Sequence, residues 1–275
     1  MTDPELAGYA RFDHATKTLL ADGVISEEHR LLFQTFSRTA MQSAFPCIGA
    51  QKVMRDYRVA FCLSPDQFNT VDGAQRTAQY LYRWSREADY AALKQMSKPT
   101  AFATCVVVFP PMDFKSENDS ERQLWEFLNK VNAYDRGRYP WSDESSNFVY
   151  DNKFSMSIGG YAHFILFLSS SALTPARRFS QPMMIFNPHF IFEVMRNADI
   201  FADWRTAIRE REKATQNGWH NPKLRDYGSQ GGFEAPQYAL TLDPTFDIGK
   251  CPFTGRPRPE NMPLFDMQGN PFGKS

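Results

Sequence analysis

The fold is decided by the stretch FSMSIGGYAHFILFLSSSALTPARRFSQPMMIFNPH, residues 154–189. Its first five residues alternate apolar and polar side chains, which is typical of a β-strand with one buried face. Gly159 and Gly160 then offer the positive φ angles of a tight turn, and the apolar run 161–168 continues the extended pattern. This pattern predicts a β-hairpin, and residues 183–186 predict one further short strand after the Ser- and Arg-rich loop.

The end of this stretch predicts the start of a helix. Asn187 is a good N-cap, and Pro188 suits the first helical position because no N–H donor is needed there. An apolar face follows with helical spacing, at Phe190, Ile191, Val194, Met195 and Ala198. His189 would then lie in the first turn, where the helix dipole favours the neutral imidazole that a metal ion requires. His189 is therefore a candidate metal ligand, with a core or capping histidine as the alternative.

The rest of the chain is expected to pack around this region. Helical spacing predicts helices over 4–20, 26–44, 74–96, 119–133 and 199–215, and strands are predicted over 58–63 and 101–109. The second of these strands contains three consecutive valines, so it should be buried on both faces. We predict an α+β fold. It has a single domain, residues 1–253, with a small mixed or antiparallel sheet covered by helices, and an extended Pro/Gly-rich C-terminal tail, residues 254–275.

Composition limits the partners. The chain has 275 residues, 42% of them hydrophobic, and 31 basic residues balance 31 acidic ones, so no net charge attracts nucleic acid or an anionic membrane. No apolar run approaches the roughly 20 residues that span a bilayer, and the N-terminus lacks the pattern of a signal peptide. We expect a cytoplasmic protein with a small-molecule partner and no nucleic-acid or membrane partner, for which a homodimer is one permitted arrangement.

Common chemical motifs are absent from the sequence. It contains no P-loop, no G-x-G-x-x-G after a strand, no H-E-x-x-H and no G-x-S-x-G, which excludes the commonest nucleotide, zinc and serine-hydrolase sites. The four cysteines are scattered, with no C-x-x-C pair, and are expected to be reduced thiols.

Several short segments, taken together and in order, resemble the YqcI/YcgG family. They are Phe45-Pro46-Cys47-Ile48-Gly49-Ala50, residues 154–160, Ala176-Arg177-Arg178-Phe179, Phe186-Asn187-Pro188-His189, Ile208-Arg209-Glu210-Arg211, Asn217-Gly218 with Asn221-Pro222, Glu234-Ala235 with Gln237-Tyr238, and Cys251-Pro252-Phe253. The likeness spans about residues 45–253. It is most specific to the subgroup that contains the haem-dependent guanidine N-hydroxylase of guanitoxin biosynthesis. This chain departs from that subgroup in the loop 169–175, where a histidine of the usual pattern is missing.

The resemblance implies an iron enzyme of natural-product biosynthesis. It implies a monooxygenase with haem b as cofactor, which uses O2 and an electron donor to N-hydroxylate an amine or guanidine of an amino-acid-like molecule. A haem needs an axial ligand, an apolar slot and cations for its two propionates. His189 is the expected ligand, and Arg177, Arg178, Lys52 and Arg55 are the expected propionate-binding residues, with surface positions as the alternative.

Two further residues complete the expected site. Cys47 is the rival iron ligand, because a thiol just after Pro46 at a helix start should have a lowered pKa; a buried inert cysteine is the alternative. Glu234 is the expected catalytic carboxylate, which would orient the substrate nitrogen and take its proton; a plain surface carboxylate is the alternative.

Two other functions remain open from the sequence. The protein could hold haem or another flat ligand without turnover, as the altered loop suggests. A non-haem iron site is the third option, if the fold brought His163, His189 and a carboxylate together.

Overall fold

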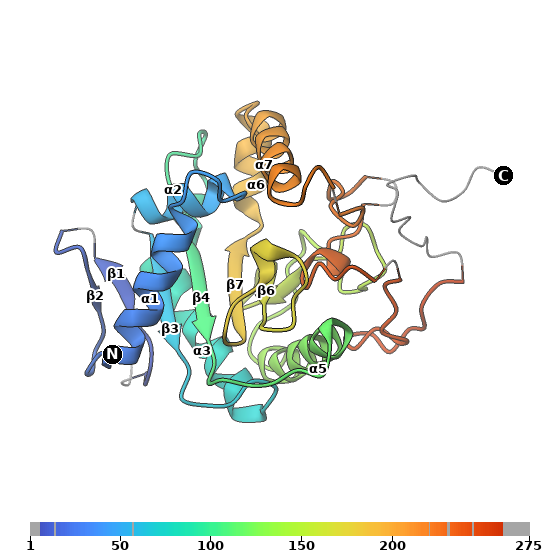
Figure 1. Ribbon diagram of the computed structural model, residues 1–275. Helices are drawn as coiled ribbons and strands as arrows, with labels where there is room; N and C mark the ends of the chain where they lie inside the picture. The colour runs from blue at the N-terminus through green and yellow to red at the C-terminus, as the bar shows by residue number, and fades with distance from the viewer. Residues whose placement is uncertain are drawn as a thin grey trace.

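The computed structural model describes residues 6–13, 15–56, 58–219, 221–229, 232–243 and 245–260. Within these ranges a mixed sheet of seven strands runs through the molecule in the order β2-β1-β3-β4-β7-β6-β5 (Figure 1). The strands are β1 Arg11–Asp13, β2 Thr18–Leu20, β3 Val59–Leu63, β4 Thr104–Val108, β5 Met156–Ile158, β6 Tyr161–Leu168 and β7 Met183–Pro188. The predicted α+β fold with a helix-covered mixed sheet is confirmed.

The centre of the sheet is β4, whose five residues are all buried, as its valine run predicts. It pairs in parallel with β3 and antiparallel with β7, so Val106 lies opposite Phe61 on one side and Ile185 on the other. All other pairings are antiparallel. Because its five residues are all buried, both faces of the middle strand are covered, and its neighbour β7 leads directly into the region around His189.

The predicted hairpin is also confirmed. Strands β5 and β6 pair antiparallel and are joined by Gly159 and Gly160, which have φ angles of 65° and 79°. A Cβ atom on Gly159 would lie 3.1 Å from the Tyr82 ring. The Gly159 N–H donates to Asp135 Oδ1 at 2.9 Å. Glycine is thus required at this turn both for its backbone angle and for its closeness to a neighbouring helix.

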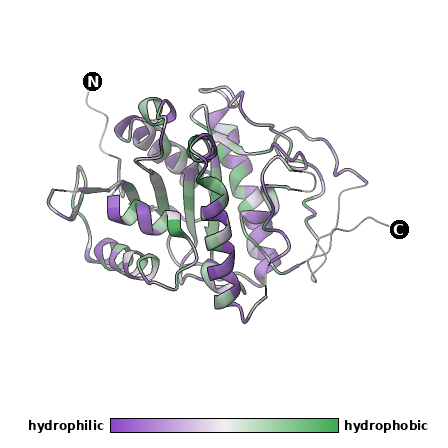
Figure 2. Ribbon diagram, turned by 90° about the horizontal axis from the view of Figure 1, so that it is seen from above, coloured by the Kyte–Doolittle hydropathy of each residue, from purple (hydrophilic) through white to green (hydrophobic). Residues whose placement is uncertain are grey.

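Seven α-helices are described in this part of the chain: α1 Glu27–Ala40, α2 Ile48–Asp56, α3 Val71–Glu87, α4 Tyr90–Lys94, α5 Glu117–Asp135, α6 Phe190–Asn197 and α7 Phe201–Thr215. The side chains of Ser26, Thr70 and Ser116 cap α1, α3 and α5 by accepting backbone N–H groups. Helices α1 and α2 lie in front of the strands in Figure 1 and α3 behind them, and the view from above in Figure 2 shows helices on both sides of the sheet.

One predicted helix is wrong, and another is divided in two. The range 4–20, of which residues 4, 5 and 14 lie outside the description, contains strands β1 and β2 joined by a turn. In that turn Asp13 Oδ2 accepts the Thr16 N–H at 2.8 Å, and Lys17 has a φ of 58°. Because β1 also pairs with β3, edge pairing to the sheet outweighs the helical spacing of the apolar residues. The range 74–96 is interrupted by Asp89, whose φ of 53° ends α3 and starts α4.

The described residues beyond 217 have little regular structure, and the first part of this segment wraps the domain. Tyr238 and Phe246 are buried against Trp125 of α5, at ring-centre distances of 5.7 Å each. Of the tail 254–275, residues 261–275 lie outside the described ranges. Across the described helices, none has the length and apolar character needed to cross a membrane.

Candidate functional site

A cavity of about 330 Å³ lies between one face of the β6–β7 sheet, helices α1, α2, α6 and α7, and the segment 224–240. That volume is within the range of small-molecule sites, which are mostly apolar with a few polar groups that fix the ligand. Aromatic side chains form much of the wall: Phe36, Phe45, Phe102, Phe164, Phe179, Phe192, Phe201 and Trp204. The functional groups converge at two places, one around His189 and one around Arg177.

The junction between β7 and α6 positions His189. Asn187 and Pro188 continue the strand, and α6 begins only at Phe190. Asn187 does not cap the helix, because its Oδ1 accepts the Thr104 hydroxyl at 2.9 Å and its Nδ2 donates to the Phe164 carbonyl at 3.4 Å. The His189 N–H donates to the Ala162 carbonyl at 2.8 Å. The predicted helix start at Pro188 is therefore wrong, because the Asn187 side chain is already bonded to Thr104 and Phe164. Strand β7 runs on to Pro188, and His189 occupies the N-cap position instead of the first turn.

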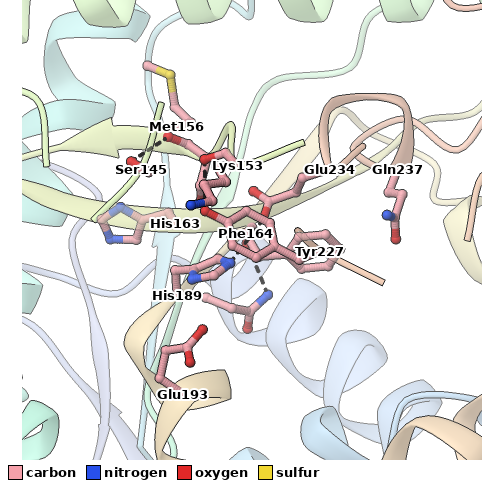
Figure 3. A network of polar contacts seen from close by, with 12 residues as sticks. Ser145, Lys153, Met156, His163, Phe164, His189, Glu193, Tyr227, Glu234 and Gln237 are labelled. Carbon is pink, nitrogen blue, oxygen red and sulfur yellow. Dashed lines mark hydrogen bonds and ion pairs between the residues drawn. The ribbon is translucent and has the colours of Figure 1, made fainter. Parts of the chain in front are cut away.

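His189 is buried, and Figure 3 shows it beside Glu234. Its Nε2 lies 3.2 Å from Glu234 Oε2. The other carboxylate oxygen, Oε1, accepts the hydroxyl of Tyr238 at 2.7 Å. The Tyr227 ring packs on the imidazole with its centre 4.2 Å away. Among the described residues no hydrogen bond is made by His189 Nδ1, so this nitrogen is the one left to face a ligand.

Glu234 is only 2% exposed, and both its oxygens have protein partners. Burial, and next the charge of Glu234, raise the pKa of the Tyr238 hydroxyl well above its ordinary value, so that it stays a donor. The sequence placed Glu234 at the substrate nitrogen; the structure places it on the cavity wall, in contact with His189.

Arg177 and Cys47 lie together at another part of the wall. The Arg177 guanidinium is buried and donates one hydrogen bond from Nη2 to the Gln237 carbonyl at 3.2 Å, while Nε has no partner among the residues that the structure describes. Burial lowers the pKa of Arg177 to about 10, although the nearby Glu212 and Cys47 oppose that shift. A buried cation with unused donors is a favourable receptor for an anionic group of a ligand.

Cys47 immediately precedes α2, and its sulfur accepts the Ala50 N–H at 3.3 Å. Burial raises the pKa of this thiol, and the Ala50 N–H and the Arg177 charge offset the effect only in part. The expectation of a lowered pKa is wrong, because desolvation of a thiolate outweighs the favourable helix start. Cys47 is thus a neutral thiol in the cavity wall.

The other expected cations do not join the cavity. Arg178 donates to the carbonyls of Ala172 and Leu173, at 2.9 and 3.4 Å, and so ties down its own loop. Lys52 pairs with Asp56 at 2.8 Å, and Arg55 is exposed. Within the described residues, none of these three basic side chains lines the cavity.

His163 faces away from His189. Along β6 the cavity is lined by Phe164, Leu166 and Leu168, so the intervening His163 points to the opposite face, where it packs near Tyr90 and Phe186. No group of three His, Cys, Asp or Glu suited to a metal ion occurs in the described part of the chain. A non-haem iron site with both histidines therefore does not form here.

Sequence reasoning missed Tyr227, Tyr238 and Glu212. Tyr238 belongs to one of the segments that carry the family likeness, and its spacing of four from Glu234 was a usable signal. Tyr227 reaches His189 from a loop without regular structure, and Glu212 lies on a helix whose mixed charges predict a solvated face. The sequence around Tyr227 and Glu212 does not indicate that the first of these side chains is half-buried and the second buried.

Comparison with known proteins adds one finding. A search of curated proteins and a search of solved structures each find no match. The model of the YqcI/YcgG family matches residues 35–254, a range that includes every residue placed above around His189 and Arg177. The chain therefore belongs to the YqcI/YcgG family.

Proposed function

We propose that the protein is a haem-dependent monooxygenase that N-hydroxylates an amine or guanidine nitrogen of an amino-acid-like small molecule. The observation that carries the proposal is His189: a buried imidazole on the wall of an apolar cavity, with Nε2 3.2 Å from a carboxylate oxygen and no hydrogen bond made by Nδ1 to any residue that the structure describes. Histidines that ligate metals commonly donate their second nitrogen to a carboxylate. The resemblance to the subgroup of guanidine N-hydroxylases supplies the reaction class.

The residues present fit haem b. The wall is rich in aromatic side chains, including Phe102 and Trp204, whose rings stack with their centres 5.2 Å apart. His189 would be the axial ligand, and the unused donors of Arg177 would hold a propionate. When bound, the haem supplies an iron centre that activates O2 with electrons from a donor.

The chain's own groups have separate tasks in this proposal. The apolar wall excludes water and favours the unprotonated form of an amine, because burial disfavours its cation. Glu212, which lines the cavity near Arg177, offers a carboxylate to a cationic substrate. Glu234 is engaged with His189 and Tyr238, so its contact with substrate, expected from the sequence, competes with these bonds.

Loop 169–175, where this chain departs from its relatives, does not line the cavity in the described structure. Its Leu173 N–H donates to Glu117 Oε1 at 3.0 Å and the Thr174 hydroxyl to the Leu240 carbonyl at 3.3 Å. The missing histidine therefore argues little against haem binding. The free state of the four cysteines fits a reducing compartment, and we propose the cytoplasm.

The decisive experiment is haem titration followed by absorption spectroscopy. The folded parent should develop an intense Soret band at one haem per chain, and C47S should give the same spectrum. The variant H189A should fold but show little bound haem or a changed ligand field, and the ferrous–CO form of the parent should lack the strong red shift of thiolate ligation.

The other outcomes are equally clear. A folded parent without a Soret band would reject the haem proposal, whereas haem binding without amine-dependent O2 consumption would favour a binding protein without turnover. Loss of the band in C47S but not in H189A would make the cysteine the ligand.

A further inference from the structure

The hydrogen bonds around Glu234 have a direction. The Tyr238 hydroxyl accepts the Met156 N–H at 3.0 Å, so its own proton is available to donate, and Glu234 Oε1 is the nearer acceptor at 2.7 Å. The alternative acceptor is the carbonyl of His163, at 3.2 Å. Tyr238 is fully buried, and no water is needed to explain its contacts. One oxygen of the Glu234 carboxylate is thus held by a donor from the core.

The second oxygen of Glu234 then influences which nitrogen of the His189 imidazole carries the proton. An ionised carboxylate can only accept, and Oε2 lies 3.2 Å from His189 Nε2, so this contact favours the tautomer that carries its N–H at Nε2. A neutral imidazole has one N–H, which leaves Nδ1 with its lone pair. Tyr227, with its ring centre at 4.2 Å, and Phe192, at 5.6 Å, restrict rotation of the imidazole out of this orientation.

We propose that Glu234 is a positioning residue, fixed by Tyr238, that holds His189 in the Nε2–H tautomer and presents Nδ1 to the cavity. The tautomer is a property of the protein alone. That Nδ1, and not the more usual Nε2, is the atom that would bind the iron of a haem rests on the function proposed above. Glu234 acts through His189 and does not itself need to touch substrate.

The tautomer is measured directly in the ligand-free protein. Two-bond ¹H–¹⁵N correlation spectra of ¹⁵N-histidine-labelled protein at neutral pH report which nitrogen carries the proton, and the signal of His189 is identified by its loss in H189N. The expected result is a single species with protonated Nε2 and bare Nδ1. A proton on Nδ1, or on both nitrogens, would overturn the inference without any reference to haem.

Variants separate positioning from simple packing. E234L removes the acceptor and should turn the single tautomer into a mixture. E234Q should restore it, because the amide oxygen can accept from Nε2 while the amide N–H donates to Tyr238, whose hydroxyl can turn to the His163 carbonyl. Unchanged His189 signals in folded E234L would refute the role.

A matched control lies four residues along the chain from His189. Glu193, also drawn in Figure 3, pairs with Arg196 and has a half-exposed side chain, so E193Q should leave the His189 signals unchanged. With haem added, E234L should change the ligand-field bands while E193Q should not. A parent that shows the expected tautomer but binds no haem would reject the proposed function and leave the positioning role of Glu234 intact.

Discussion

At the scale of single residues, Arg177 and Arg178 show how differently the fold uses neighbours. Both have the same chemistry and belong to the same segment of the sequence, yet one guanidinium enters the cavity and the other bonds two carbonyls of its own loop. Their expected equivalence as propionate-binding residues rests on the family resemblance, which implies haem, and on their shared positive charge. What separates them is the short 3₁₀-helix Pro175–Arg177, which ends between the two side chains.

The pair gives a matched test of carboxylate binding. R177M should lower the affinity for protoporphyrin IX roughly ten- to hundredfold, the value of about one charge-assisted hydrogen bond. R178M should leave that affinity unchanged but lower the free energy of unfolding by about 1–2 kcal/mol, because two backbone carbonyls lose their donor.

Fluorescence titrations provide the control within the same experiment. The dimethyl ester of protoporphyrin IX has no carboxylates, so the parent and R177M should bind it equally. An equal loss for acid and ester would mean that Arg177 only shapes the wall.

At the scale of elements, the strands were easier to predict than the helix boundaries. The hairpin, the buried strand and α5 follow from local spacing, because their burial pattern is a property of consecutive residues. The prediction of a helix start at Asn187-Pro188 was wrong because these residues pair with β6. Strand β1 was predicted as helix because its partner β3 lies far along the chain. Pairing between residues far apart in the chain cannot be predicted from the spacing of neighbouring residues.

Strand β6 also makes a prediction about pH. His163 is buried on the face away from the cavity, and neither ring nitrogen has a hydrogen-bond partner within the described structure. Burial lowers the pKa of His163 to about 3, against about 6.5 in the unfolded chain. Below pH 6.5 His163 is protonated in the unfolded state but stays neutral in the folded state. It should therefore lower the free energy of unfolding by about 1.4 kcal/mol for each pH unit down to pH 3.

Urea unfolding at pH 7 and pH 5.5 measures this effect. The parent should lose about 1 kcal/mol more than H163L between the two values. His29, whose pKa burial also lowers, contributes to both proteins alike and cancels in the comparison. Parallel pH profiles for the parent and H163L would show that His163 takes up its proton in the folded state.

At the scale of the whole molecule, the irregular C-terminal segment is bound to α5 by buried charges. Lys223 is almost fully buried, donates to the Thr241 hydroxyl at 2.6 Å, and lies near Glu121, whose Oε2 accepts from the same hydroxyl at 3.1 Å. Glu117 accepts the Leu242 N–H at 2.8 Å. These charged contacts join residues more than about 100 positions apart, so they leave no local pattern in the sequence.

These charges should be strongly coupled. K223M should lower the free energy of unfolding by roughly 3 kcal/mol, because Glu121 is left buried without a cation. The double variant K223M/E121L should be less destabilised than the sum of the two single variants, with a coupling of about 0.5–3 kcal/mol. Additive losses, measured by urea unfolding of all four proteins, would show that Lys223 and Glu121 stabilise the segment independently.

The late position of that segment has a consequence for synthesis. Strand β7 ends at Pro188, whereas Tyr227, Glu234 and Leu240, which close the cavity, come about 40 to 50 residues later. At roughly 5–20 residues per second, the ribosome needs about 3–10 s to add them. During those seconds the nascent chain carries an uncovered aromatic face on β6 and β7, to which a chaperone could bind. We therefore expect a ligand to be retained only after residue 240 has left the exit tunnel.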